Sequence, residues 1–173
     1  MRNRSAPAAD VVPILIYDDV AKAVEWLCEA FGFQERLRAP DRNGVISHAQ
    51  LIVGDGAIML GRSRSPIEAL RAQDIRQYVL VDVEDADAHC ERAKRHGATI
   101  LQAPADMPFG ARQYTASDLE GHWWTFSQNI ADVEPSAWGA SGSSEIEMLG
   151  QRAPHSEQTE RLNGQRRLPH AQW

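Results

Sequence analysis

The sequence predicts an α+β fold in which two tandem βαβββ modules form an eight-stranded mixed sheet, with helices on the outer face. Two observations carry this prediction. The segments that begin at Val11 and Gln77 share one plan: an apolar strand, an acidic turn, an Ala-rich amphipathic helix and a closing glycine. Short apolar strands separated by turn residues follow each of them. A chain of 173 residues with 43% hydrophobic content can bury such a core.

The first module is predicted over residues 11–61. In "DDVAKAVEWLCEAFGF", apolar residues recur every three or four positions and form one helical stripe: Val20, Val24, Leu27 and Phe31. Gly32 is expected to end this helix in the left-handed conformation. Strands are then predicted at "FQERLR", "ISHAQLIV" and "AIML", with a loop at "APDRNG" and a hairpin turn at "GDG".

The second module is predicted over residues 77–130. Its helix carries the stripe Ala86, Cys90 and Ala93 and ends at Gly97. Strands are predicted at "TILQ", "RQYTAS" and "HWWTFSQ", with a Pro-rich loop at "APADMPFG" and a turn at "DLEG". The two modules together make a domain over residues 11–134.

Three further segments connect or flank the modules. Residues 1–10 are an N-terminal extension, and the linker from Arg62 to Arg76 has room for a turn of helix. From residue 135 to residue 173 the composition shifts to Gly, Ser, Gln and Arg without a sustained apolar period. This tail is predicted to be disordered or to act as a docking segment.

Charge and cysteine usage exclude several classes of protein. A net charge of -6, with 24 acidic against 18 basic residues and no basic cluster, argues against nucleic acid as a partner. The apolar stretch 11–16 is too short for a membrane span or a signal-peptide core, so we expect a cytoplasmic protein that does not bind membranes. Cys28 and Cys90 lie in predicted helices without a neighbouring cysteine, which is typical of free structural thiols.

Two motifs carry a family resemblance. "DDVAKAVEWLCEAFGF" in the first module and "FGARQYTASDLEGHWWTFSQ" in the second, with its D-x-E-G-x-x-W-x-F ending, resemble the vicinal oxygen chelate superfamily. That superfamily includes glyoxalase I, extradiol dioxygenases, fosfomycin-resistance enzymes and bleomycin-resistance proteins. The resemblance covers about residues 10 to 130. It implies that each module's sheet curls into a cup and that the cups enclose a cleft.

The resemblance also implies where a metal would bind. Metal-binding members place four ligands in the cleft, usually His, Gln or Glu, on the first and last strands of each module. In this sequence those positions fall at Val12 (or Pro13), Met59, Tyr78 (or Gln77) and Thr125. Gln77 is the one side chain among them that suits the hard ions these enzymes use. The resemblance therefore implies a member with no metal ligands and no cofactor.

Alternation along the last strand assigns its residues to two faces. If Thr125 points into the cleft, Trp123 and Ser127 share its face, while His122, Trp124 and Phe126 lie on the other. Trp123 is then a candidate stacking wall for a ligand, and Trp124 and Phe126 are expected to pack in the core against the second helix.

Five other side chains have two interpretations each. His48 either donates a hydrogen bond to a ligand or is a satisfied structural residue. Arg112 and Tyr114 either bracket an anionic or aromatic ligand, or Arg112 pairs with Asp118 or Glu120 across the turn. His89 and His96 lie on the second helix, where we expect solvated or packing roles.

The function expected from these residues is that of a metal-free, bleomycin-resistance-like homodimer that binds a small apolar or aromatic molecule. The predicted ligand-binding residues are Val12, His48, Met59, Tyr78, Arg112, Tyr114, Trp123 and Thr125. One alternative is a metal-dependent lyase or dioxygenase of the same superfamily that uses Gln77, His48 and His122. Another is an interaction scaffold in which the tail is the functional element.

Overall fold

A computed structural model describes residues 5–7, 9–63 and 77–140 of the chain. The chain forms two compact units, Met1–Val133 and Glu134–Trp173. Most of the predicted linker and of the tail lies outside the described residues. The described part of the second unit contains one turn of 3₁₀-helix, Pro135–Trp138. No helix among the described residues is long and apolar enough to cross a membrane.

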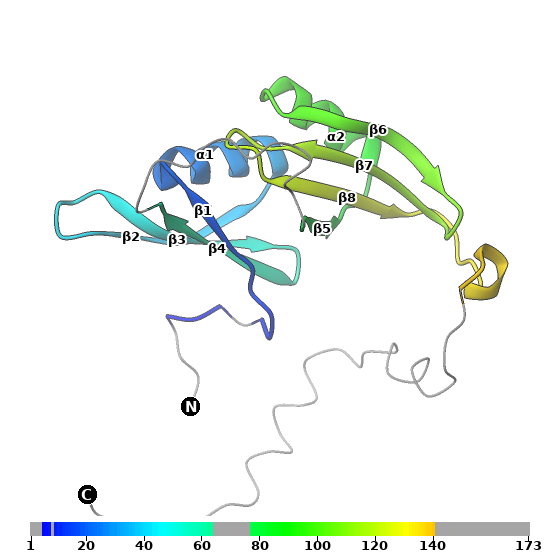
Figure 1. The fold of residues 1–173 in the computed structure, drawn as a ribbon, viewed down its shortest axis with the longest axis horizontal. Coiled ribbons are helices and arrows are strands. Elements are labelled where there is room, and N and C mark those ends of the chain that lie inside the picture. Colours follow the sequence, from blue (N-terminus) through cyan, green and yellow to red (C-terminus); the bar gives the residue numbers. More distant parts are fainter. Residues whose placement is uncertain (1–4, 8, 64–76, 141–173) are drawn as a thin grey trace, which may run out of the picture. The chain divides into compact units, whose positions relative to one another are not determined.

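The first unit contains the two predicted modules in order (Figure 1). The elements of the first module are β1 (Ile14–Tyr17), α1 (Val20–Phe31), β2 (Gln34–Pro40), β3 (Ile46–Val53) and β4 (Gly56–Arg62). Those of the second are β5 (Val79–Asp82), α2 (Ala86–Arg95), β6 (Thr99–Met107), β7 (Ala111–Ser117) and β8 (Trp123–Asn129). The βαβββ repeat predicted from the sequence is confirmed.

The strands form two four-stranded sheets with the same topology. Sheet 1 has the order β1-β4-β3-β2, and sheet 2 has the order β5-β8-β7-β6. In each sheet the first strand pairs in parallel with the last strand of its module, and the other neighbours are antiparallel. Both sheets are therefore mixed, as predicted. The eight strands form two sheets, whereas the prediction joined them in one.

Two predicted loops are shorter than expected. β2 continues through Ala39 to Pro40, and β6 continues through Pro104 to Met107, so the first two residues of "APDRNG" and most of "APADMPFG" belong to strands. Both are edge strands whose register shifts near the prolines. An edge strand tolerates proline because one side of it needs no hydrogen bond to a neighbour. The prediction that these prolines lie in loops was wrong because both prolines lie in edge strands.

The helix ends follow the predicted capping chemistry. Asp19 and Asp85 precede the helices, and their carboxylates accept the backbone N–H of Lys22 at 3.1 Å and of Ala88 at 2.9 Å. Gly32 ends α1 with a φ of 77°, and Gly97 follows α2 with a φ of 84°. These positive φ angles favour glycine, which explains why the two repeats share it.

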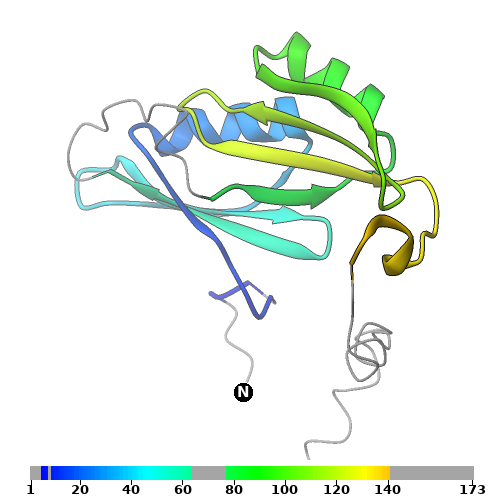
Figure 2. The ribbon, with the colours of Figure 1, turned by 45° about the vertical axis from the view of Figure 1, so that its right-hand side comes forward.

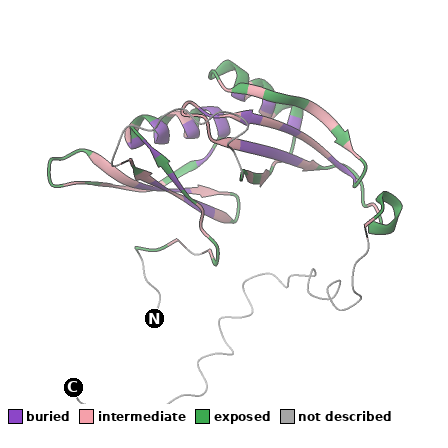
Figure 3. Cartoon of the chain, viewed as in Figure 1, coloured by how far each residue is buried: buried purple, intermediate pink, exposed green. Residues whose placement is uncertain are grey.

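One hydrophobic core serves both modules. Phe31 at the end of α1 contacts Trp124 and Phe126 of β8, with ring centroids 5.6 Å and 4.8 Å apart. Phe33, just after α1, lies 5.4 Å from Trp124 by the same measure. Trp124 and Phe126 are fully buried, as predicted, and Figure 3 shows that buried residues lie along β8 and along α1. Their burial against the first module as well as the second makes the two modules one packing unit.

The two helices also satisfy each other's carbonyl ends. Trp26 of α1 donates its indole N–H to the carbonyl of His96 after α2, at 2.7 Å. Arg92 of α2 donates to the carbonyls of Glu29 at 2.8 Å and Cys28 at 3.0 Å in the last turn of α1. The last carbonyls of a helix have no partner within the helix, so this exchange supplies several of them from the other repeat.

Gly110 in the β6–β7 turn lies close to the backbone of Ala131 and offers a test of how closely the chain packs there. It has a φ of 83°, and a Cβ at this position would overlap the carbonyl oxygen of Ala131. We expect Gly110→Ala to lower the free energy of unfolding by about 3 kcal/mol, since backbone strain adds to a steric overlap. Gly44 has a φ of 80° with nothing within 4 Å of the position that a methyl group would take, so Gly44→Ala isolates the backbone strain.

We expect the Gly44→Ala control to cost about 1 kcal/mol. Urea unfolding of the two variants and the wild type measures both values. Equal losses in the two variants would show that the turn shifts to accommodate the methyl group at residue 110.

Candidate functional site

Each sheet has one face covered by its helix and an opposite face that we call the free face. On sheet 1 the paired residues Ile14, Met59 and Gln50 form one row across the free face, and Ile16, Gly61 and His48 form the next. Ile14 is 62% exposed, whereas Leu15 between these rows is buried on the helix side. An aliphatic side chain this exposed in a regular strand is available for contact with another molecule.

The free face of sheet 2 has the same mixture of apolar and small polar groups. Leu80 of β5 is 52% exposed and pairs with Thr125 of β8. Tyr78, just before β5, is 60% exposed. The hydroxyls of Thr125 and Thr115 are 3.1 Å apart, so they satisfy each other across the sheet. These two hydroxyls are therefore paired with each other, next to the exposed side chain of Leu80.

The predicted alternation along β8 is confirmed. Thr125 and Ser127 pair with the free-face residues Leu80 and Asp82 of β5, whereas Trp124 and Phe126 point into the core. Trp123 lies at the start of the same strand and is partly exposed. By the same alternation it shares the free face with Thr125.

Six of the eight predicted ligand-binding residues come to the free faces or their margins. Met59 and His48 lie on the free face of sheet 1, and Val12 precedes the start of β1. Tyr78, Trp123 and Thr125 belong to the free face of sheet 2. The imidazole of His48 lies 3.3 Å from the amide nitrogen of Gln50. The ligand-binding roles of these residues stay predictions.

Arg112 and Tyr114 lie on the opposite face of sheet 2, toward α2. Arg112 pairs with Asp87 of α2 at 2.6 Å and with Asp106 of β6 at 2.6 Å. The sequence predicted that Arg112 and Tyr114 share a face, which is correct, but it placed that face in the cleft. The predicted alternative partners of Arg112, Asp118 and Glu120, are also wrong. A period of two tells which residues share a face, but it does not tell which face the helix covers.

Tyr114 forms a buried pair with His89 of α2. The Tyr114 hydroxyl lies 2.6 Å from Nδ1 of His89, and Nε2 of His89 lies 3.0 Å from the carbonyl oxygen of Phe31. The carbonyl only accepts, so Nε2 donates to it and Nδ1 accepts from the tyrosine. Burial lowers the pKa of His89 and raises the pKa of Tyr114. Of the two roles predicted for His89, packing is the one observed.

The positions that the resemblance assigns to metal ligands hold Val12 or Pro13, Met59, Tyr78 or Gln77, and Thr125, none of which is a carboxylate or an imidazole. Across residues 5–7, 9–63 and 77–140, no group of three or more His, Cys, Asp and Glu side chains comes together as a metal site. His122, which the alternative metal set requires, contacts Asp118 and Tyr17 instead. Its Nδ1 lies 3.2 Å from the Asp118 carboxylate, and its ring centroid lies 4.4 Å from that of Tyr17. The donors at these positions do not fit a divalent ion.

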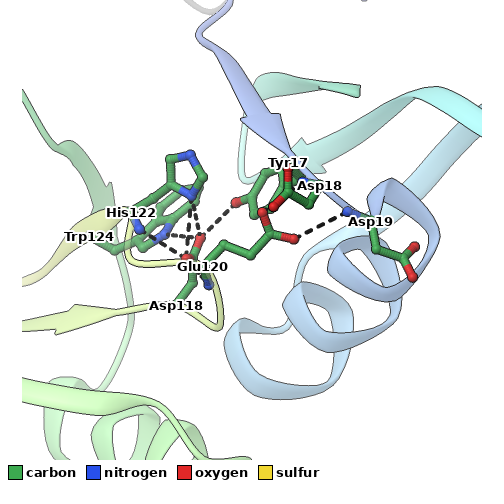
Figure 4. Close-up of polar contacts among 7 residues, drawn as sticks. All are labelled: Tyr17, Asp18, Asp19, Asp118, Glu120, His122 and Trp124. Carbon is green, nitrogen blue, oxygen red and sulfur yellow. Dashed lines mark hydrogen bonds and ion pairs between the residues drawn. The ribbon is translucent and has the colours of Figure 1, made fainter. Parts of the chain in front are cut away.

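A network centred on Asp118 joins the two modules next to this strand (Figure 4). The Asp118 carboxylate accepts from the Tyr17 hydroxyl at 2.6 Å and from the Trp124 indole N–H at 3.1 Å. It also accepts from the backbone N–H groups of Glu120 and His122. Asp118 is 6% exposed, and such a buried carboxylate is stable only when its oxygens are hydrogen-bonded.

The ionisation of this network follows from its contacts. Burial acts to raise the pKa of Asp118, but the hydrogen bonds and charge of His122 and the hydrogen bonds from Tyr17 and Trp124 outweigh it, so the pKa is lowered. Burial, followed by the charge of Asp118, raises the pKa of Tyr17 well above its usual value. Asp118 is therefore ionised and Tyr17 is protonated at neutral pH.

Glu120 extends the connection to the start of α1. Its carboxylate accepts the backbone N–H of Asp18 at 2.7 Å and of Asp19 at 3.3 Å. The D-x-E-G-x-x-W-x-F motif thus has a physical explanation in this chain. Asp118, Glu120 and Trp124 tie the modules together, and Gly121 takes a φ of 94° in the turn between them. Sequence spacing gave no signal for these contacts because the partners are about a hundred residues apart.

The fold and its free faces define a class of paired βαβββ proteins. The family model of the Glyoxalase/Bleomycin resistance protein/Dioxygenase superfamily matches residues 10–126, and the chain belongs to this superfamily. The resemblance seen in the sequence is confirmed at that level.

Several relatives and solved structures are similar to the chain. The protein Mb0911c of Mycobacterium bovis is 30% identical over 142 residues, which cover 77% of this chain and 91% of the relative. The structure of TioX from Micromonospora sp. ML1 is 38% identical with a TM-score of 0.59, covering 71% of this chain and 100% of that one. The fosfomycin resistance protein FosX from Listeria monocytogenes, at 16% identity and a TM-score of 0.57, covers 71% and 94% and shows the shared fold.

The Asp118 network predicts a large stability loss on a small change. Asp118→Asn replaces one acceptor oxygen with an NH₂ group, whose N–H bonds would face the N–H and O–H donors that now bind the carboxylate. We expect a loss of about 3 kcal/mol in the free energy of unfolding, measured by urea denaturation at pH 7. The control is Asp106→Asn, an exposed carboxylate paired with Arg112, for which we expect little change.

The difference in the free energy of unfolding between wild type and Asp118→Asn should depend on pH. The folded-state pKa of Asp118 lies below the unfolded value of about 3.9, so its stabilising effect is complete above that value. The effect is lost as the pH falls through the lower, folded-state pKa. The gap between wild type and Asp118→Asn should therefore narrow as the pH is lowered from 7 toward 3. A gap that stays constant over this range would contradict the assignment of the ionised carboxylate.

Proposed function

We propose that the protein binds a small apolar or aromatic molecule, without a metal ion, in a cleft that a homodimer forms between free faces. The observation that carries the proposal is the exposure of apolar side chains on both free faces. Ile14, Ile16, Tyr78 and Leu80 are each 42% to 62% exposed within or beside regular strands. Exposed apolar side chains that recur on one face of a sheet are typical of a binding face.

The contacts in the hydrophobic core explain why the proposed cleft needs a second copy of the chain. The helix-covered faces of both sheets meet in one set of contacts, for example between Phe31 and Trp124. The free faces lie on the other sides of the two sheets, away from those contacts. One chain therefore does not bring them together as the walls of one cleft. Two copies that pair sheet 1 of one with sheet 2 of the other would do so, and they would bury the exposed apolar residues.

The chemistry of the free faces favours binding by burial and stacking. Trp123 and Tyr78 offer aromatic surfaces, and Met59 offers a flexible, polarisable side chain that adapts to irregular ligands. The hydroxyls of Thr125 and Thr115 are occupied by each other, so few polar groups remain to orient a ligand. The donor set at the family's metal positions, Val12, Met59, Tyr78 and Thr125, supports a metal-free mode. A cytoplasmic location is proposed with it.

Ligand binding can be measured by tryptophan fluorescence. We expect at least one member of a panel of aromatic and cationic antibiotics to quench the emission saturably, with no effect of EDTA. Trp123→Phe should remove most of this quenching because it removes the reporter on the free face while retaining an aromatic ring. Trp138→Phe, which changes the 3₁₀-helix of the other unit, is the control and should retain the quenching. No saturable quenching with any compound would contradict the proposal.

Self-association tests the dimeric cleft. We expect the wild-type chain to sediment as a dimer and Leu80→Lys to sediment as a monomer, because a charge in place of an exposed leucine opposes burial of that face. Val45→Lys is the control, since Val45 is 43% exposed but lies in the turn between β2 and β3. Analytical ultracentrifugation at micromolar concentration distinguishes the two species. A monomeric wild type would show that the free faces are not paired in this way.

A further inference from the structure

Gln50 is a large polar side chain that is buried on the same face of sheet 1 as the exposed Ile14 and Ile16. It lies on the free face of sheet 1 in the same row as Met59 and Ile14. Ile14 is 62% exposed, whereas Gln50 is 3% exposed. The helix-covered side of the sheet cannot explain this burial, because Gln50 points away from it. Something on the free face therefore covers Gln50.

The cover is the chain's own N-terminal extension. Gln50 donates its amide N–H to the carbonyl oxygen of Ser5 at 3.0 Å, and Arg36 of β2 donates to the carbonyl oxygen of Ala6 at 3.1 Å. The segment before β1 lies on the side of sheet 1 opposite α1 (Figures 1 and 2). We call residues 5–7 the N-terminal strap. The strap forms no helix or strand, and the two hydrogen bonds above tie consecutive carbonyls to the free face.

The side chains under the strap form one network. Arg36 also donates to the Oε1 atom of Gln50, and the Gln50 amide nitrogen lies 3.3 Å from Nε2 of His48. With Oε1 held by the arginine, the amide and guanidinium N–H groups point outward as donors. Oxygen acceptors are their complement, and the strap carbonyls are such acceptors. The network is a polar patch at the margin of an apolar face.

We propose that Arg36, Gln50 and His48 form a polar subsite of the ligand face, which takes a carbonyl, carboxylate or sulfonate oxygen of a bound small molecule. In the unliganded protein the N-terminal strap fills this subsite, and a ligand with such a group displaces it. This inference rests on the proposed binding function. It adds the chemical group that a ligand needs besides its apolar body, and it makes the strap a competitor for the same donors.

A matched pair of fluorescent probes isolates the acceptor group. 1-Anilinonaphthalene-8-sulfonate and N-phenyl-1-naphthylamine share one aromatic skeleton, and only the first carries a sulfonate. Gln50→Leu keeps the approximate size of the side chain and removes the donor. Only the sulfonate probe displaces the strap, so loss of the strap contact would by itself lower the ratio of the two dissociation constants, and a rise in this ratio reports the lost donor. We expect that ratio, sulfonate over amine, to rise about tenfold in Gln50→Leu, the loss typical of a hydrogen bond to a charged group.

Gln102→Leu is the control for this substitution. Gln102 is an exposed residue of the edge strand β6 in the other module, and its replacement makes the same chemical change away from the subsite. The ratio should stay at the wild-type value there. An unchanged ratio in Gln50→Leu would overturn the subsite, whatever the absolute affinities are.

Strap displacement has its own readout in the full-length chain. We expect heteronuclear NOE values of the Ser5 and Ala6 amides to indicate order in the free protein. They should fall on saturation with the sulfonate probe, and they should fall without any probe in Gln50→Glu, whose carboxylate repels the Ser5 carbonyl. If neither probe binds, the proposed function fails, and the Gln50→Glu spectrum still tests the strap. Strap amides that stay ordered in Gln50→Glu would overturn the strap assignment.

Discussion

The arrangement of the two modules depends on one buried carboxylate. Asp118 accepts hydrogen bonds from Tyr17 at the end of β1 and from Trp124 in β8, so it can be satisfied only when both modules are in place. Because a buried charge without partners is costly, this requirement selects one relative orientation of the sheets. Glu120 in the same turn holds the segment that leads into α1 by accepting from the backbone N–H groups of Asp18 and Asp19. The positions of both free faces follow from these contacts.

The sequence predicted what is local and periodic. The repeat, the helix stripes, the glycine ends at Gly32 and Gly97 and the two faces of β8 all follow from spacing, and the structure agrees. The sequence did not predict the contacts that depend on a distant segment of the chain. The partner of Arg112 is set by where α2 places Asp87, and the partner of Asp118 lies in the other repeat. Alternation and capping rules contain no information about such contacts.

The two faces of each sheet have separate roles because the physical demands on them differ. On the helix side the core side chains are buried, and polar groups such as the hydroxyl of Tyr114 are hydrogen-bonded. The free side carries exposed aliphatic and aromatic groups together with the donors of Arg36 and Gln50. Substitutions on the free side can change what the protein contacts without disturbing the core, which is consistent with the varied functions known on this fold.

The exchange between Trp26 and Arg92 has a consequence for how a duplicated protein evolves. Each repeat supplies the group that completes the helix of the other, through His96 in one direction and Cys28 in the other. A descendant that lost one half would lose these donors, and the carbonyls of Glu29 and His96 would have to bind water in their place. The two halves are therefore no longer independent copies. Their sequences can diverge elsewhere, but at these positions a change in one repeat is selected according to its effect in the other.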